Sequence, residues 1–290
     1  MDEPLISVVV AAYNSKDLLK DSLQSLITQN FDKKNYEIIV VDDGSKDGTS
    51  FFLKSFVKDK TNIHYVRQEN KGVAGARNTG IKLSKGKIVA FTDQDCLADK
   101  NWLKEIAKSF LDKELIGVSG CVITETKKVN PFAHYVLDET AGNFISCNVA
   151  YRKDILEKLN GFDVGFNYGF DDTDLYLRAT KLGKLTSNKN AIICHRVIPW
   201  SFVKFVKRIK VEYNSQFKFS TKYPHIYKNR NIILSILWGR GLKAFFIALQ
   251  LYKKWIFKNP IIYEAFIFGL LLQRYYLLYL CIGNKNVAKT

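Results

Sequence analysis

The stretch Lys87-Ile88-Val89-Ala90-Phe91-Thr92-Asp93-Gln94-Asp95 decides the fold prediction for this chain. Residues 88–92 are almost entirely apolar, which is typical of a strand buried on both faces of a sheet. Asp93 and Asp95 follow, and side chains two residues apart on an extended segment point the same way. Because ligands bind beyond the carboxyl ends of strands in open α/β sheets, these carboxylates are candidate ligands of Mg²⁺ or Mn²⁺. A lone D-x-D pair is common by chance, so this interpretation depends on the rest of the chain.

Other strands precede this one, and they alternate with helices. Apolar runs predict the strands, and apolar residues at helical spacing predict the helices. The predicted strands cover residues 5–12, 36–41 and 63–66, and the predicted helices cover residues 18–26, 49–57 and 73–84. Further strands are expected at residues 115–118 and 143–152. The alternation indicates an α/β fold with a mostly parallel, Rossmann-like sheet flanked by helices.

Polar residues follow the predicted strands where one crevice is expected. Tyr13 could stack on a nucleobase, and Asp43 could accept an imide N–H from it. Gly72 lies at the start of a helix, where free N–H groups attract anions, and Arg77 carries a planar fork suited to phosphate or ribose oxygens. Ordinary loop-to-helix packing would explain the glycine equally well, and Tyr13 could be a plain aromatic at the rim.

Acidic residues also gather near position 171, before and within a predicted helix. Asp174 and Arg178 have the spacing of an i, i+4 ion pair, and we expect that pair on the helix surface. Acidic residues at a helix N-terminus are explained by the helix dipole, but Asp171 and Asp172 are expected in the loop that enters the helix, which makes them more suggestive. Neighbouring carboxylates also repel, which raises the pKa of one and suits a catalytic base.

Over residues 4–196 the sequence resembles the inverting, family-two glycosyltransferases, whose fold is called GT-A. Each matching motif is weak alone, but their order and spacing together are specific. The motifs are Val8-Val9-Val10-Ala11-Ala12-Tyr13-Asn14, Val41-Asp42-Asp43-Gly44-Ser45-Lys46-Asp47-Gly48-Thr49, Asn70-Lys71-Gly72-Val73-Ala74-Gly75-Ala76-Arg77-Asn78, Thr92-Asp93-Gln94-Asp95, Cys147-Asn148-Val149-Ala150-Tyr151-Arg152, Gly161-Phe162-Asp163, Asp171-Asp172-Thr173-Asp174-Leu175 and Cys194-His195.

The resemblance implies roles for individual residues in binding a nucleotide-diphosphate sugar and a divalent metal, Mn²⁺ or Mg²⁺. Asp95 would be a metal ligand, and His195 would complete the metal or diphosphate contacts. Asp172 would be the base, with Asp171 beside it, although many members carry Glu-Asp at this pair. The donor-binding residues would be Ala12, Tyr13, Asp43, Lys71, Gly72, Arg77 and Asp93, with Asp43 on the base and Asp93 on the ribose and phosphates.

The implied chemistry is a single in-line displacement. Asp172 would take a proton from the acceptor hydroxyl as that oxygen attacks the anomeric carbon. The metal on Asp95 would stabilise the leaving diphosphate, assisted by helix N–H groups and Arg77.

The net charge of +16 is concentrated at one end of the chain. Residues 196–290 hold 17 of the 44 Lys and Arg residues and two of the 28 acidic residues, a net charge of +15, which leaves +1 for residues 1–195. This change predicts a catalytic domain at residues 1–199 and a basic, aromatic helical segment at 200–290.

The C-terminal segment favours helices that lie in an anionic membrane surface, since Lys and Arg alternate with Phe, Trp and Tyr. Apolar stretches occur at 232–238, 242–252 and 261–282; the last is long enough to span, but Arg274 inside it is costly in a bilayer. A soluble helical subdomain and a homo-oligomer formed through these helices are alternatives. Nucleic-acid binding is disfavoured, because no known module accompanies the charge.

Five scattered cysteines without a C-x-x-C motif favour a reducing compartment and argue against a disulfide framework or a zinc site. The acidic N-terminus, running directly into a predicted strand, does not read as a signal peptide. We therefore expect the protein at the cytoplasmic face of the cell membrane, peripheral or monotopic, acting on a glycan or lipid-linked acceptor.

Two other functions fit parts of the sequence. A sugar-nucleotide nucleotidyltransferase would need a Gly-rich, basic loop after the first strand, and Tyr13-Asn14-Ser15 does not provide one. An inactive, membrane-bound scaffold that binds nucleotide sugars is disfavoured by the intact Asp43, Asp95 and Asp172.

Overall fold

The computed structural model of the chain describes residues 4–126, 133–166, 168–199 and 201–227. The chain divides into two compact units, and the division falls after Pro199. The described part of the second unit is α7 (Phe202–Lys222), capped by the Ser201 hydroxyl, and a short 3₁₀ turn at Pro224–Tyr227. The three apolar stretches predicted between residues 232 and 282 lie outside the described residues.

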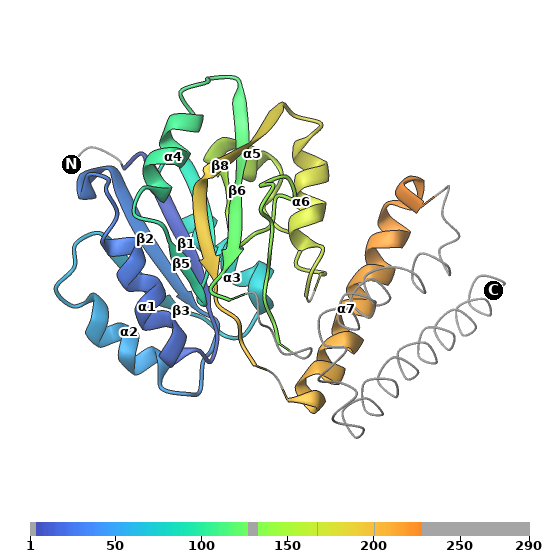
Figure 1. Cartoon of the computed structure of the whole chain (residues 1–290), viewed down its shortest axis with the longest axis horizontal. Helices are drawn as coiled ribbons and strands as arrows, with labels where there is room; N and C mark the ends of the chain where they lie inside the picture. The colour runs from blue at the N-terminus through green and yellow to red at the C-terminus, as the bar shows by residue number, and fades with distance from the viewer. Residues whose placement is uncertain (1–3, 127–132, 167, 200, 228–290) are drawn as a thin grey trace. The chain divides into compact units, whose positions relative to one another are not determined.

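The first unit contains one eight-stranded sheet with the order β3-β2-β1-β4-β7-β6-β8-β5 (Figure 1). The strands are β1 (Ile6–Ala12), β2 (Tyr36–Asp42), β3 (Ile63–Arg67), β4 (Ile88–Asp93), β5 (Cys96–Ala98), β6 (Leu115–Thr124), β7 (Val149–Arg152) and β8 (Lys184–His195). The neighbours among β1 to β4 are parallel, and so are β6 and β8, whereas β7 and β5 run antiparallel to their neighbours. The α/β fold with a mostly parallel sheet is therefore confirmed.

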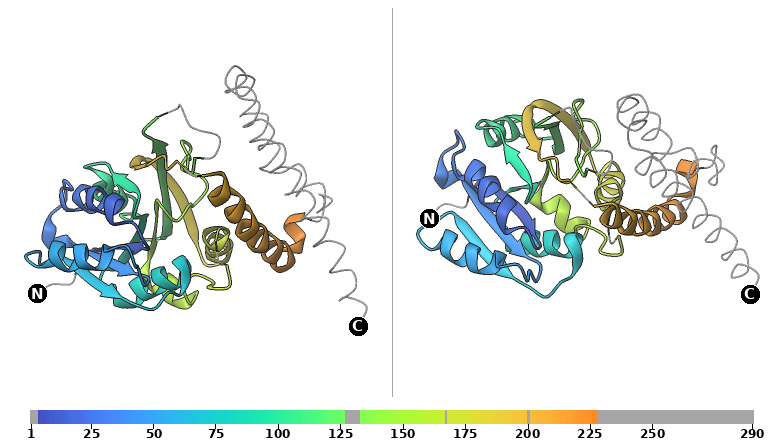
Figure 2. Two further views of the ribbon diagram at one scale, coloured as in Figure 1. Left: turned by 90° about the horizontal axis from the view of Figure 1, so that it is seen from below. Right: turned by 60° about the horizontal axis from the view of Figure 1, so that its bottom comes forward.

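Helices cover both faces of this sheet (Figure 2). One face packs against α1 (Lys16–Ile27), α2 (Thr49–Val57) and α4 (Trp102–Ser109), and the other against α3 (Gly72–Leu83), α5 (Lys153–Lys158) and α6 (Asp171–Ala179). Every residue of β1 and β2 is buried, with successive side chains entering opposite layers. Each fully buried Val, Leu or Ile stabilises the fold by about 1.5–3 kcal/mol relative to exposure. Two-sided burial explains why these strands read as continuous apolar runs.

The strand predicted at residues 143–152 is too long, because only Val149–Arg152 pairs in the sheet. The residues before Val149 form a turn, and the buried Asn148 side chain lies between β6 and β8, where the two strands do not pair directly. Its Nδ2 donates to the carbonyls of Cys121 and Ala191, both at 2.8 Å, and its Oδ1 accepts from Trp102 at 2.8 Å. This gap in the pairing coincides with the register shift at Gly120/Cys121. Asn148 thus replaces ladder hydrogen bonds that the bulge removes.

In the part of the chain that the structure describes, no helix is both long and apolar enough to cross a membrane.

Candidate functional site

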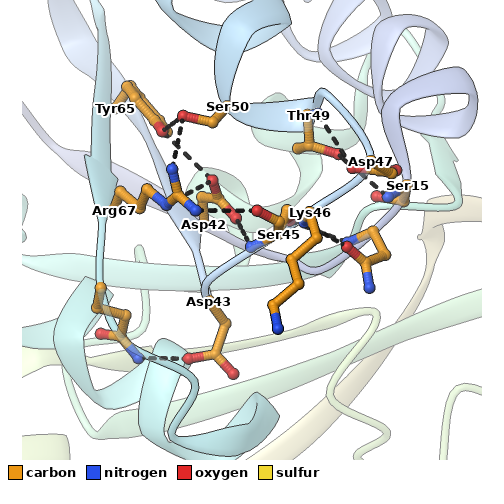
Figure 3. Close-up of polar contacts among 12 residues, drawn as sticks. Ser15, Asp42, Asp43, Ser45, Lys46, Asp47, Thr49, Ser50, Tyr65 and Arg67 are labelled. Carbon is orange, nitrogen blue, oxygen red and sulfur yellow. Dashed lines mark hydrogen bonds and ion pairs between the residues drawn. The ribbon is translucent and has the colours of Figure 1, made fainter.

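The loops after β1 and β2 are joined by hydrogen bonds at the carboxyl edge of the sheet (Figure 3). Asn14, with a left-handed φ of 48°, receives a bond at its side chain from the Lys46 N–H and donates its own N–H to the Ser45 hydroxyl. Asp42 is fully buried and accepts the Ser45 N–H at 2.8 Å. This carboxylate therefore shapes the turn, and the next residue, Asp43, is left to face the crevice.

Asp43 is nearly buried, and its Oδ1 accepts from Gln68 Nε2 at 2.7 Å and from the Lys71 N–H at 2.8 Å. Its own N–H donates to the Ala12 carbonyl at 2.8 Å. Three of the predicted donor-binding residues, Ala12, Asp43 and Lys71, are thus brought together. Lys71 immediately precedes α3, and Gly72 opens that helix with a φ of 77°, which favours glycine.

Tyr13 leaves the end of β1 with its side chain 45% exposed. Its backbone is held by Gln94, whose Oε1 accepts the Tyr13 N–H at 2.7 Å and whose Nε2 donates to the Tyr13 carbonyl at 3.4 Å. Gln94, the middle residue of the D-x-D motif, was not predicted to have a role. Its amide therefore ties the β4 loop to the β1 loop and fixes the backbone that carries the exposed Tyr13 ring.

Asp93 and Asp95, which the sequence predicts to point the same way, contact different residues. Asp93 is the last residue of β4, and a turn at Gln94 and Asp95 separates it from β5. The extended geometry behind the prediction ends at Asp93, so the two carboxylates make different contacts. Asp93 Oδ1 lies 2.8 Å from Arg77 Nη2, whereas Asp95 Oδ1 lies 3.7 Å from His195 Nε2.

Arg77 is buried and bridges two predicted site residues. Its Nη2 binds Asp93 at 2.8 Å, and its Nη1 binds Asp171 at 2.7 Å. Burial lowers the pKa of the guanidinium, but Asp93 and Asp171 together raise it above its ordinary value, so the charge is retained. Both terminal nitrogens of Arg77 therefore bind carboxylates of the protein, and the predicted contact with donor phosphate or ribose stays a prediction.

Asp171 and Asp172 occupy the first two positions of α6, but their surroundings differ. Burial raises the pKa of Asp171 to about 6, although Arg77 opposes the shift. Asp172 is partly exposed, and its Oδ2 accepts the Ser146 N–H at 3.3 Å. The buried carboxylate is held in an ion pair, whereas the accessible one has room to accept a proton from a ligand.

The pairing of Asp174 with Arg178 is confirmed, with 2.8 Å between Oδ2 and Nε, but its predicted place on the helix surface is wrong. Asp174 is fully buried. Arg178 also donates to the carbonyls of Leu159 and Gly161, which ties α6 to the loop after α5. Because α6 packs against this loop, the pair that the sequence spacing places on the helix surface is buried in the structure.

His195, Asp95 and Cys96 form a cluster whose ligand atoms all lie within 4.8 Å of one another. His195 Nδ1 lies 2.7 Å from the Arg196 carbonyl, and His195 Nε2 lies 3.7 Å from Asp95 Oδ1. In the tautomer with the proton on Nδ1, that nitrogen donates to the carbonyl and Nε2 presents its lone pair to Asp95. A backbone carbonyl that fixes one nitrogen in this way is the usual support of a metal-bound imidazole. Two electron-rich atoms that face each other at 3.7 Å fit a cation between them.

Cys96 was not predicted as part of this group, and no spacing motif indicates it. Burial raises the pKa of its thiol well above the usual range, and its Sγ lies 4.0 Å from Asp95 Oδ1. His134 adds a second imidazole, edge-on to His195 with ring centroids 5.3 Å apart. The oxygen and nitrogen ligands suit a divalent ion such as Mn²⁺, with sulfur as an additional soft donor.

The sequence profile of one family, described as Glycosyl transferase family 2, matches residues 7–160. The match covers more than half of the chain and includes the ends of β1, β2 and β4. The chain belongs to glycosyltransferase family 2.

Relatives in this family include the glycosyltransferase AglE of Haloferax volcanii, 29% identical over 209 residues, which are 68% of this chain and 68% of AglE. The putative glycosyltransferase EpsH of Bacillus subtilis is 28% identical over 54% of this chain. The poly(ribitol-phosphate) beta-glucosyltransferase of Bacillus spizizenii is 36% identical over 43% of this chain. The chain spans only 49% of EpsH and 22% of the Bacillus spizizenii enzyme.

Solved structures show the same GT-A fold. A mannosyltransferase of Pyrobaculum calidifontis, in complex with GDP-Man and Mn²⁺, has a TM-score of 0.64 at 20% identity and covers 98% of this chain and 87% of its own. TarS of S. aureus, in complex with UDP-GlcNAc, has a TM-score of 0.54 at 21% identity, over 72% of this chain and 66% of its own.

Proposed function

We propose that the protein is an inverting, metal-dependent glycosyltransferase that moves a sugar from a nucleotide-diphosphate sugar to a hydroxyl group. The observation that carries this proposal is the contrast at the start of α6, where Asp171 is buried against Arg77 and Asp172 is partly exposed. A base must reach the hydroxyl that it deprotonates, and only Asp172 of this pair has access. An inverting transfer needs one base and no covalent intermediate with the protein.

The donor is proposed to lie along the carboxyl ends of β1, β2 and β4. Tyr13 would stack on the base, Asp43 would accept an N–H from it, and Asp93 would contact the ribose or phosphates. The GDP-Man and UDP-GlcNAc complexes of the structural neighbours support a donor of this class. In this proposal Arg77 acts by holding Asp93 and Asp171, and therefore does not touch the donor itself.

Asp95 and His195 would hold the divalent metal. A bound metal neutralises the charge that develops on the leaving diphosphate. Asp172 removes the proton from the acceptor oxygen as that oxygen attacks the anomeric carbon on the face opposite the diphosphate. The leaving group keeps the electrons of the broken bond, and the new bond has the inverted configuration.

Replacement of Asp95 by Ala is the direct test of the metal proposal. The variant should lose Mn²⁺-dependent binding of nucleoside diphosphates, since it removes a ligand of the ion, while its Tm stays near that of wild type. Calorimetric titration of UDP and GDP with Mn²⁺, and again with EDTA, gives the measurement. Wild-type affinity that is the same in EDTA as in Mn²⁺ would refute the role of the metal.

The acceptor is proposed to be a glycan or lipid-linked sugar destined for a surface polysaccharide. Relatives of the chain include the poly(ribitol-phosphate) beta-glucosyltransferase named above and a putative teichuronic acid biosynthesis glycosyltransferase of Bacillus subtilis. A donor-hydrolysis assay separates this enzyme from an inactive scaffold, because only an active site would release the free sugar. The family membership leaves no support for a nucleotidyltransferase.

We also propose that residues 200–290 bind an anionic membrane at the cytoplasmic face. In α7 the only acidic residue is Glu212, while the basic residues are Lys204, Lys207, Arg208, Lys210, Lys218 and Lys222. Each basic residue near an anionic surface contributes about 1 kcal/mol of attraction.

Full-length protein is expected to sediment with liposomes that contain phosphatidylserine and to stay in solution with purely zwitterionic ones. Removal of residues 200–290 should abolish the binding, because it removes most of the net charge. High salt or carbonate releases a protein that lies on the surface and leaves a spanning one embedded. Full-length protein that ignores both kinds of liposome would refute the membrane proposal.

A further inference from the structure

A glutamine and a threonine behind Asp43 form a hydrogen-bonded pair outside the predicted site. We propose that Gln68 and Thr79 are positioning residues that fix the Asp43 carboxylate and thereby determine for which nucleobases the donor site is selective. The inference rests on the proposed function, because it assumes that Asp43 meets the donor base.

The backbone of Gln68 is held firmly at the end of β3. Its N–H donates to the Asp42 carbonyl at 3.0 Å, which continues the pairing of β2 with β3 by one residue. Arg67, just before it, donates from Nη2 to the Ser45 carbonyl at 3.0 Å and so joins β3 to the same loop. The Gln68 side chain therefore projects from a fixed point toward Asp43.

Thr79 determines which way round the Gln68 amide lies. The Thr79 hydroxyl is 2.6 Å from Gln68 Oε1 and donates to it, since the alternative acceptor, the Gly75 carbonyl, is farther away at 3.2 Å. With Oε1 occupied, Nε2 faces Asp43 at 2.7 Å. The reverse orientation would put an amide oxygen against a carboxylate, so only one arrangement satisfies all three side chains.

This arrangement leaves Asp43 with one oxygen to offer. Oδ1 already accepts from Gln68 Nε2 and the Lys71 N–H, whereas no described residue donates to Oδ2. A ligand must therefore bring an N–H donor to Oδ2. Uracil and guanine carry a ring N–H on their pairing edge. Adenine and cytosine have a bare ring nitrogen there, whose lone pair a carboxylate repels, so they can donate only from the exocyclic amino group beside it.

The pair thus converts a freely rotating carboxylate into a directional acceptor for bases that carry a ring N–H. A site built around a hydrogen bond rejects ligands that lack the partner group more strongly than an apolar pocket does. Without Gln68, Oδ1 loses a donor and the carboxylate can turn. Without Thr79, the Gln68 amide loses the hydroxyl that holds it in place. Discrimination among bases should then fall while the chemistry at Asp172 is untouched.

The test uses full-length protein with Mn²⁺ and measures Kd for UDP, GDP, CDP and ADP. Wild type should bind UDP or GDP at least about tenfold more tightly than CDP and ADP. Gln68→Leu should weaken binding of the preferred nucleotide by about tenfold, as expected for loss of a bond to a charged group. Thr79→Val removes only the bond to Gln68, so it should weaken binding less, and both variants should reduce the preference. With the corresponding sugar donor, KM should rise and kcat at saturation should not.

Two further variants separate positioning from packing. Thr79→Ser keeps the hydroxyl and should behave as wild type, whereas Thr28→Val, at the exposed C-cap of α1, controls for loss of a hydroxyl elsewhere. If Gln68→Leu lowers the Tm, Thr79→Val carries the test, because it exchanges one oxygen for a methyl group. Unchanged Kd and preference, or an equal loss for all four nucleotides, would overturn the inference. Wild-type protein that binds none of the four would instead refute the proposed function and the inference with it.

Discussion

Replacement of Asp172 by Asn is expected to lower sugar transfer by about 100-fold or more, with little change in donor affinity or Tm. The substitution is nearly isosteric and keeps an oxygen that can accept the Ser146 N–H. It removes the basicity needed to take the acceptor proton, so the loss should appear in kcat. Turnover at saturating donor and acceptor is the measurement, and donor Kd in Mn²⁺ shows whether binding is intact.

The neighbouring carboxylate provides the contrast. Asp171→Asn removes one of the two charges that face the buried Arg77, so its Tm should fall along with its activity. Asp154→Asn, on the exposed face of α5, is the matched control and should change neither quantity. Near-normal turnover of Asp172→Asn would show that Asp172 is not the base. Full activity of both Asp171→Asn and Asp172→Asn would refute the proposed mechanism.

Much of the catalytic unit is predictable because its strands are buried on both faces. Such strands must be apolar throughout, so β1, β2 and β4 stand out in the sequence to within about a residue of their ends. Polar residues that follow them directly must meet at one edge of the sheet. The resemblance, rather than this rule, grouped Asp43 with Ala12 and Lys71, and hydrogen bonds join Asp43 to both residues.

The parts that could not be predicted depend on contacts between distant segments. Arg77 and Asp171 are 94 positions apart, and nothing local distinguishes a guanidinium that binds phosphate from one buried between carboxylates. Asp174 and Arg178 have the spacing of a surface pair, and only the packing of α6 against the loop at Leu159 makes them buried. Cys96 likewise joins Asp95 and His195 through the pairing of β5 with β8. Sequence patterns indicate which strands and helices form, but not which distant residues pack against a given side chain.

Substitution of Arg77 should lower the stability of the catalytic unit more than any other substitution considered above. Its variants also distinguish a structural bridge from a contact with donor phosphate. Arg77→Met leaves Asp93 and Asp171 without their shared partner, so the free energy of unfolding should fall by about 3–5 kcal/mol, as for other buried ion pairs that lose one member. Arg77→Lys keeps the charge but has no fork to reach both carboxylates, so it should rescue stability only in part. Urea unfolding of the three proteins is the measurement.

The double variant Arg77→Met/Asp171→Asn settles the cause of the instability. If the bridge is what Arg77 provides, removing the charge of Asp171 should recover part of the stability that Arg77→Met loses, and the coupling energy should exceed about 1 kcal/mol. Transfer should stay low in the double variant, because the start of α6, and with it Asp172, is no longer held against β4 through Arg77. A donor that bound the Arg77 guanidinium directly would give another pattern. Arg77→Met would then raise the donor Kd steeply, with normal unfolding and no coupling to Asp171.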